Sequence, residues 1–149
     1  MKTLFEQSAV LEVRGRIAQL RPDSARQWGK MNVAQAVAHC AAGLEMAVGD
    51  RKPPRMFVGR MIGPLVKRLA LGAKPLRPNS PTAKDLVVQD ERDLEIERKR
   101  LDGLVSRFSG AGTPGCTTHP HTFFGRMTPA EWGILMYKHL DHHLRQFGV

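Results

Sequence analysis

Apolar residues recur three and four positions apart along most of this chain, which is the spacing of one face of an α-helix. No stretch sustains the alternation of apolar and polar residues that is typical of a strand, and no internal repeat is apparent. The pattern therefore predicts an all-α protein.

Two predicted helices lie in the first third of the chain. The first follows the capping-box match Thr3-Leu4-Phe5-Glu6 and ends before Pro22, and the second follows the match Asn32-Val33-Ala34-Gln35 and ends at Gly49. A capping box favours a helix start because two side chains satisfy backbone N–H groups that have no partner inside the helix.

The third long helix is predicted to begin at Asp90, whose carboxylate can cap it, and to end at Gly110. Its outer face is densely charged, so we expect that face to be solvated. Its buried stripe comprises Leu94, Leu101, Leu104, Val105 and Phe108.

The last predicted helix opens at the capping box Thr128-Pro129-Ala130-Glu131 and runs to about Phe147. The residues that share its inward face are Trp132, Leu135, Met136, His139, His143 and Gln146. The residues expected to point elsewhere are Ile134, Lys138, Asp141 and Arg145.

Residues 51–84 carry the whole charge excess of the chain. They contain nine Lys and Arg and no acidic residue, whereas the rest of the chain holds 14 basic and 14 acidic residues, and the net charge is +9. Bulky apolar residues alternate with the basic ones at roughly helical spacing, but proline permits only short or kinked helices. We therefore expect a short, basic, amphipathic surface helix. The prolines are Pro53, Pro54, Pro64, Pro75, Pro78 and Pro81.

Four long amphipathic helices with this insertion between the second and third indicate a four-helix bundle. A length of 149 residues with 42% hydrophobic content suits one domain over residues 1–149. The N-terminus becomes charged too soon for a signal peptide and no apolar run could span a membrane, so we expect a cytoplasmic protein. Cys40 and Cys116 make no spacing pattern and are expected to be reduced, with Cys40 acting as a small buried apolar residue.

Three histidines could converge inside such a bundle. His139 and His143 lie one turn apart on the last helix, with Cβ atoms about 5–6 Å apart, and His39 lies among apolar residues of the second helix. If these helices face each other, the three imidazoles supply the number of ligands found in catalytic zinc sites that keep one position open. The alternative is that they are hydrogen-bonded core or surface histidines, and the residues alone favour neither interpretation.

Other polar residues could act around this site. His142 is one residue off the inward face and is expected at the rim of the site or packed directly around its ligands, while Asp141 and Gln146 could hydrogen-bond to the ligands. His119 and His121 lie on the loop before the last helix and could be substitute ligands or a catalytic acid or base. The competing interpretation of that pair is a turn stiffened by proline.

Several stretches of the chain resemble the DinB/YfiT-like superfamily of proposed metalloenzymes, and within it an uncharacterised bacterial branch. The last of them is the most specific. They are residues 31–39 (MNVAQAVAH), 79–83 (NSPTA), 124–132 (FGRMTPAEW) and 138–147 (KHLDHHLRQF).

The resemblance implies a four-helix bundle in which a histidine of the second helix and an H-x-x-x-H pair of the last helix bind a divalent metal. These positions fall on His39, His139 and His143. It also implies thiol-dependent transferase or isomerase chemistry, which some relatives perform. The superfamily's usual ending after the second histidine of the pair resembles His-Arg-Gly-Gln, whereas this chain has Leu144-Arg145-Gln146. The resemblance therefore implies the same metal ligands in this chain, but it does not indicate the substrate.

These observations favour a metal-dependent enzyme of transferase or hydrolase type. The three histidines would hold Zn²⁺ or Ni²⁺, or else Fe²⁺, and would activate water or a thiol for a small anionic or thiol-linked substrate. Catalytic acid and base candidates are His119, His121 and His142.

Two alternatives stay open, and the sequence is also compatible with a homodimer. Residues 51–84 could form a basic module that binds nucleic acid or an anionic membrane, although no nucleic-acid motif appears and prolines interrupt the segment. The metal could instead be purely structural and tie the second and last helices together.

Overall fold

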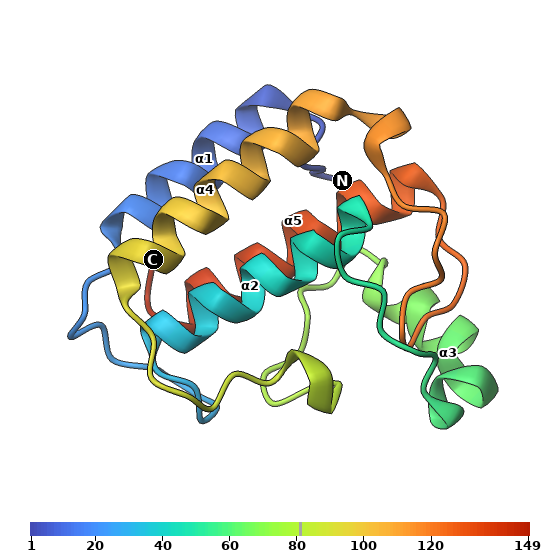
Figure 1. Ribbon diagram of the computed structural model, residues 1–149, viewed down its shortest axis with the longest axis horizontal. Helices are drawn as coiled ribbons and strands as arrows, with labels where there is room; N and C mark the ends of the chain where they lie inside the picture. Colours follow the sequence, from blue (N-terminus) through green and yellow to red (C-terminus); the bar gives the residue numbers. More distant parts are fainter. Residues whose placement is uncertain (81) are drawn as a thin grey trace.

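The computed structural model describes residues 1–80 and 82–149, and in these residues it contains five α-helices (Figure 1). The described residues form no strand, and their only bridge-type backbone pairing is the isolated one between His121 and Gly125. The all-α prediction is therefore confirmed. The helices are α1 (Gln7–Gln19), α2 (Val33–Val48), α3 (Phe57–Ala70), α4 (Leu94–Ala111) and α5 (Pro129–Gln146), with short 3₁₀ turns η1 (Lys84–Leu86) and η2 (Thr113–Gly115).

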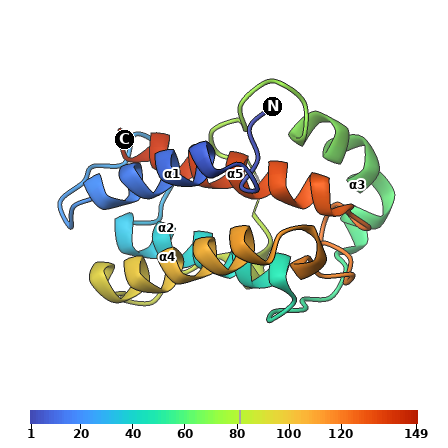
Figure 2. The ribbon, with the colours of Figure 1, turned by 90° about the horizontal axis from the view of Figure 1, so that it is seen from above.

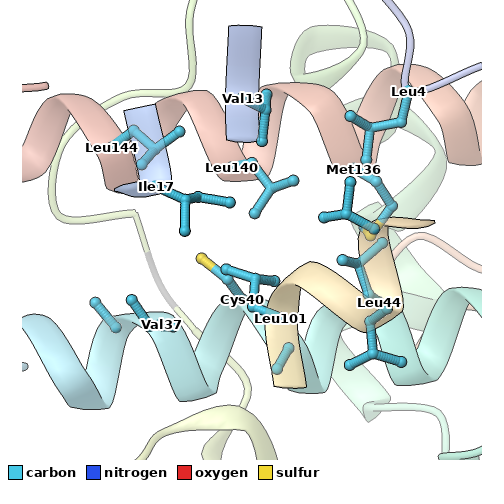
Figure 3. Packing of buried hydrophobic residues seen from close by; sticks show 14 of the residues in the cluster. Leu4, Val13, Ile17, Val37, Cys40, Leu44, Leu101, Met136, Leu140 and Leu144 are labelled. Atoms are coloured by element: carbon cyan, nitrogen blue, oxygen red, sulfur yellow. The ribbon is translucent and has the colours of Figure 1, made fainter. Parts of the chain in front are cut away.

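Helices α1, α2, α4 and α5 surround one hydrophobic core. α2 packs against α4 and α5, and α1 packs against the same two helices, so each has two neighbours in this group (Figure 2). The apolar stripes that the sequence predicted fill the space between them (Figure 3). Core residues from different elements include Leu4, Val13, Val37, Leu44, Leu101, Val105 and Leu140.

Helix α3 lies outside this group, at one end of the molecule (Figure 1). It is a helix of 14 residues with Pro64 in its interior, and it is the amphipathic surface helix that the sequence predicted among the prolines. Pro64 removes one backbone donor from the helix, and its ring is exposed. Pro81, another of the prolines in this region, lies outside the described residues.

Two capping boxes predicted from the sequence are present. The Asn32 side chain accepts from the Gln35 N–H, and the Thr128 side chain accepts from the Glu131 N–H, with both reciprocal bonds formed. Gly49 ends α2 in the left-handed conformation, at φ 87°. The starts of α2 and α5, which carry the three candidate histidines, were therefore predicted correctly.

The predicted capping box at Thr3 is wrong. Helix α1 begins at Gln7, and its N-cap residue Glu6 makes no side-chain capping bond. Leu4 is fully buried and its N–H donates to the Gly133 carbonyl oxygen of α5, so the chain forms a turn here before the helix starts. The burial of Leu4 therefore decides the local structure here, and the capping-box match at Thr3 does not.

The predicted ends of α4 are also wrong by a few residues. Asp93, not Asp90, caps α4 by accepting from the Ile96 N–H, and Asp90 pairs with Arg92 instead. The helix ends at Ala111, one residue beyond the predicted stop at Gly110.

Lys138 was predicted to turn away from the inward face of α5, and the sequence indicated no partner for it. It is buried, and its Nζ donates to the carbonyl oxygens of Gly72 and Lys74. These carbonyls belong to the connection from α3 to α4, which passes over α5. Lys138 therefore anchors that connection.

No helix among the described residues combines the length and the apolar character that crossing a membrane requires.

Candidate metal centre

The structure brings together the three histidines that the sequence singled out. His39 comes from α2 and His139 and His143 come from α5, and one ring nitrogen from each lies within 4.8 Å of the other two. Their ring centroids are 4.7, 4.8 and 4.9 Å apart. In the described part of the chain, no other three histidine, cysteine or acidic residues gather in this way.

The His39 ring is held from outside the cluster. Its Nδ1 lies 2.7 Å from the Leu86 carbonyl oxygen in η1, and because a carbonyl can only accept, Nδ1 carries the proton. The Nε2 lone pair of the neutral ring therefore points into the cluster, 2.8 Å from His139 Nε2. A second hydrogen bond of this kind is the usual way in which a metal-ligating histidine is oriented.

His143 is oriented in the same way, by Gln146. Its Nδ1 donates to Gln146 Oε1 at 2.8 Å, and Gln146 Nε2 donates to the Trp28 carbonyl oxygen at 2.7 Å. The second bond fixes which way the amide faces, so the oxygen is presented to His143. The prediction that Gln146 hydrogen-bonds beside the site is confirmed.

Gly43 provides the room for the His139 ring. A Cβ atom built at Gly43 would lie 3.1 Å from both Cε1 and Nδ1 of His139. The ring therefore rests directly against α2, where only glycine fits without displacement. The sequence analysis missed this residue, although its position one turn after His39 on the same helical face was a usable signal.

Burial keeps the three imidazoles neutral. Burial and, to a smaller extent, the neighbouring histidines lower the pKa of His143 to about 3 and the pKa of His139 well below its usual range. Burial also lowers the pKa of His39, although its bond to the Leu86 carbonyl opposes that shift. Neutral imidazole is the form that binds metal, so little proton competition is expected at neutral pH.

The donor set fits a divalent transition metal. Tetrahedral Zn²⁺ with nitrogen ligands at about 2.0–2.1 Å needs nitrogen atoms about 3.3 Å apart. The cluster's nitrogens range from the 2.8 Å pair to the 4.8 Å limit, so their separations bracket that distance. Three nitrogens leave one tetrahedral position for a further ligand.

The other candidate histidines do not join the cluster. His119 Nε2 lies 3.2 Å from the Pro53 carbonyl oxygen, and His121 Nδ1 accepts from the backbone N–H groups of Phe123 and Phe124. His142 is buried beside His143, with ring centroids 5.0 Å apart. Only His142 therefore packs its ring on a member of the cluster.

His142 and Asp141 are both engaged elsewhere. His142 Nδ1 lies 3.3 Å from the Leu76 carbonyl oxygen, and of the two positions that the sequence predicted, the ring occupies the one packed around the ligands rather than the rim. Asp141 pairs with Arg16 and Arg145 at 2.9 Å each and does not orient a cluster histidine. Asp141 therefore links α5 to α1.

Neither cysteine forms a disulfide or joins the cluster. Cys40 is buried among apolar side chains of the core (Figure 3), and this burial raises the pKa of its thiol. The expectation that Cys40 is a small buried apolar residue is confirmed.

A surface cavity of about 170 Å³ adjoins the residue that orients His39. Leu86 forms part of its lining, and so do Arg51, Arg92 and Arg100. Glu45 pairs with two of these arginines, buried Glu97 pairs with two, and Asp90 pairs with Arg92, so three carboxylates balance the three guanidinium charges. An anionic ligand in this cavity would have to compete with these carboxylates.

Comparison with known families assigns the chain to a protein family of unknown function. Residues 3–148 match the family described as "Protein of unknown function (DUF1569)", and the chain belongs to this family. No curated protein and no solved structure matches the chain.

Proposed function

We propose that this protein binds one divalent metal ion through His39, His139 and His143. The observation that carries the proposal is the convergence of three ring nitrogens from two helices, two of them on rings whose outer nitrogen already donates to a protein oxygen. The remaining nitrogens of these rings face one another, and His39 Nε2 and His139 Nε2 lie 2.8 Å apart, at hydrogen-bond distance. A cation bound among the rings would replace that hydrogen bond. A shared cation satisfies all three at once.

We further propose a single domain over residues 1–149, with α1, α2, α4 and α5 as a four-helix bundle of the DinB/YfiT-like type. The circuit of neighbouring helices and the position of the histidine cluster between α2 and α5 support this assignment. Helix α3 is then an insertion in the connection between α2 and α4.

The proposed activity is that of a metal-dependent transferase or hydrolase. A bound Zn²⁺, Ni²⁺ or Fe²⁺ would lower the pKa of a water molecule or a thiol and make it a nucleophile near neutral pH. His39 and His143 would hold their ring orientations through Leu86 and Gln146. We assign proton transfer to His142 rather than to His119 or His121, because only its ring packs on the cluster. The substrate would be a small molecule, anionic or thiol-linked.

Metal content of protein purified without a histidine tag tests the proposal. We expect about one equivalent of metal in the natural protein and almost none in His139→Ala/His143→Ala, because the double variant keeps one ligand. His119→Ala is the matched control, since it removes a partly buried histidine outside the cluster, and should retain the metal. Equal, near-zero content in all three proteins would contradict the proposal.

A structural ion that ties α2 to α5 is the alternative, and the near-complete burial of His39, which is 3% exposed, favours it. The two roles differ in whether a ligand position stays open. In protein loaded with Co²⁺, a small thiol should shift the visible absorption bands if the position is open. An unchanged spectrum together with a raised melting temperature would favour the structural role.

A further inference from the structure

The outward face of α3 is apolar and exposed. Phe57, Met61, Leu65 and Leu69 follow one another at intervals of four residues, and the side chains of Phe57, Met61 and Leu69 are 76%, 71% and 72% exposed. Val58 and Ile62 extend the same face and are also exposed. Monomeric proteins rarely leave so many large apolar side chains together in water, so we expect another molecule to cover this face.

The opposite face of α3 fixes the helix on the protein. Gly59 and Gly63 are buried against the backbone at Phe123, so closely that a Cβ atom at either position would collide with it. Lys67 donates to the Arg126 carbonyl oxygen and pairs with Glu131 at 2.9 Å. Rotation of α3 about its axis would break these contacts, so the apolar face is held outward.

The segment that carries this face is basic. Residues 51–84 carry nine basic side chains and no acidic one. Arg60 and Arg68 are exposed on α3 itself, and in the described part of the chain neither forms an ion pair. Four more cations of the segment are likewise exposed and form no ion pair with a described residue: Lys52, Lys74, Arg77 and Lys84. These cations are available to a negatively charged partner.

We propose that α3 docks the protein on an anionic membrane surface, with Phe57, Met61, Leu65 and Leu69 inserted at the headgroup boundary. An interfacial helix of this kind combines a strong apolar face with flanking Lys and Arg and lies in the plane of the membrane. Each basic residue near an anionic leaflet strengthens binding roughly fivefold. An anionic membrane surface would thus contact both the apolar face of α3 and the surplus cations.

The charge and the apolar face argue against two other occupants. A second copy of the chain would place the Arg60 and Arg68 side chains of both copies together, with no acidic residue in 51–84 to pair with them. Nucleic acid would use the cations but not the apolar side chains, because its interfaces are polar. Lipid matches both features.

Flotation with lipid vesicles tests the proposal. The protein should float with vesicles that contain about 30% phosphatidylserine, should not float with neutral vesicles, and should detach as salt is raised. Phe57→Ser/Met61→Ser should weaken binding about tenfold or more through lost apolar insertion, and Arg60→Glu/Arg68→Glu should do the same through lost charge. Leu11→Ser/Ile96→Ser, which changes two exposed apolar residues on α1 and α4, should bind like the natural protein.

A tryptophan introduced on this face supplies a second readout that does not depend on weakened variants, with the natural protein as reference because it already contains Trp28 and Trp132. In Phe57→Trp, anionic vesicles should shift the emission of the new indole to shorter wavelength, because insertion removes it from water. No flotation, or flotation that both α3 variants leave unchanged, would overturn the proposal. So would a dimer that Phe57→Ser/Met61→Ser dissociates in the absence of vesicle binding, or binding to duplex DNA that only Arg60→Glu/Arg68→Glu abolishes.

Discussion

At the scale of single residues, Gly43 sets how closely the His139 ring approaches α2. Substitution of Gly43 by Ala should lower metal affinity about tenfold or more, because the Cβ atom displaces a ligand ring from its position. Titration of the metal-free protein with Zn²⁺ measures this directly.

Gly103→Ala is the matched control for that substitution. Gly103 also lies inside a helix, but a Cβ atom there meets nothing within 4 Å. It should leave metal affinity unchanged and raise the free energy of unfolding by up to about 1 kcal/mol, because alanine favours helix over glycine. Equal metal affinity in the Gly43 and Gly103 variants would show that the His139 ring is not confined by α2.

The sequence was sufficient to identify side chains at the candidate site but not the backbone that orients them. The four-residue spacing of His139 and His143 and the apolar surroundings of His39 are visible in the sequence, and so is the position of Gln146 one turn after His142. The carbonyl of Leu86 is not, because any residue has a carbonyl and only the path of the chain brings this one to His39. The distance between α2 and α5 likewise depends on the complete packing of the helices.

At the scale of helices, Asp93 and Asp90 differ in what they stabilise. Asp93→Ala should lower the free energy of unfolding by about 1 kcal/mol, because it removes the side-chain acceptor at the N-terminus of α4. Asp90→Ala should cost less than about 0.5 kcal/mol, because it removes an exposed ion pair with Arg92. Urea unfolding of both variants makes the comparison, and a larger loss for Asp90→Ala would contradict the assigned cap.

The sequence predicted which helices form better than where each one begins. The apolar stripes of α1, α2, α4 and α5 are long enough to override local signals, so all four helices were found. The start of α1 was misplaced because burial of Leu4 against α5 is a long-range contact that the capping motif at Thr3 does not contain. The short or kinked amphipathic helix expected among the prolines is α3, which runs for 14 residues through Pro64.

At the scale of the whole molecule, buried neutral histidines make stability depend on pH. Burial lowers the pKa of His121 to about 4, and the nearby Arg55 contributes. The unfolded chain takes up a proton on this ring below about pH 6.5, whereas the folded chain does so only near pH 4, so stability falls as pH falls through this window. At pH 5 the loss due to His121 is about 2 kcal/mol.

His121→Asn isolates this contribution, because an amide oxygen can still accept from the backbone N–H groups of Phe123 and Phe124 but does not titrate. The metal-free variant should lose less stability between pH 7 and pH 5 than the natural protein does. Urea unfolding at both pH values provides the measurement. Parallel losses in the two proteins would mean that His121 is protonated in the folded state.

The connection from α3 to α4 was the part of the overall arrangement that the sequence predicted least well. Lys138 was expected off the inward face of α5 with no partner indicated, whereas two backbone carbonyls of this connection accept hydrogen bonds from its ammonium group. A charged side chain is expected to be exposed unless a partner satisfies it. For Lys138 that partner is a segment more than 60 residues earlier in the chain.

Anomalous diffraction from crystals of tag-free protein, recorded on either side of the absorption edge of the metal found in it, tests the central claim most directly. We predict one peak within about 2.0–2.2 Å of a ring nitrogen from each of His39, His139 and His143. A peak held by other residues would contradict the claim. So would the absence of any peak after incubation with Zn²⁺, with the Nε2 atoms of His39 and His139 still hydrogen-bonded to each other.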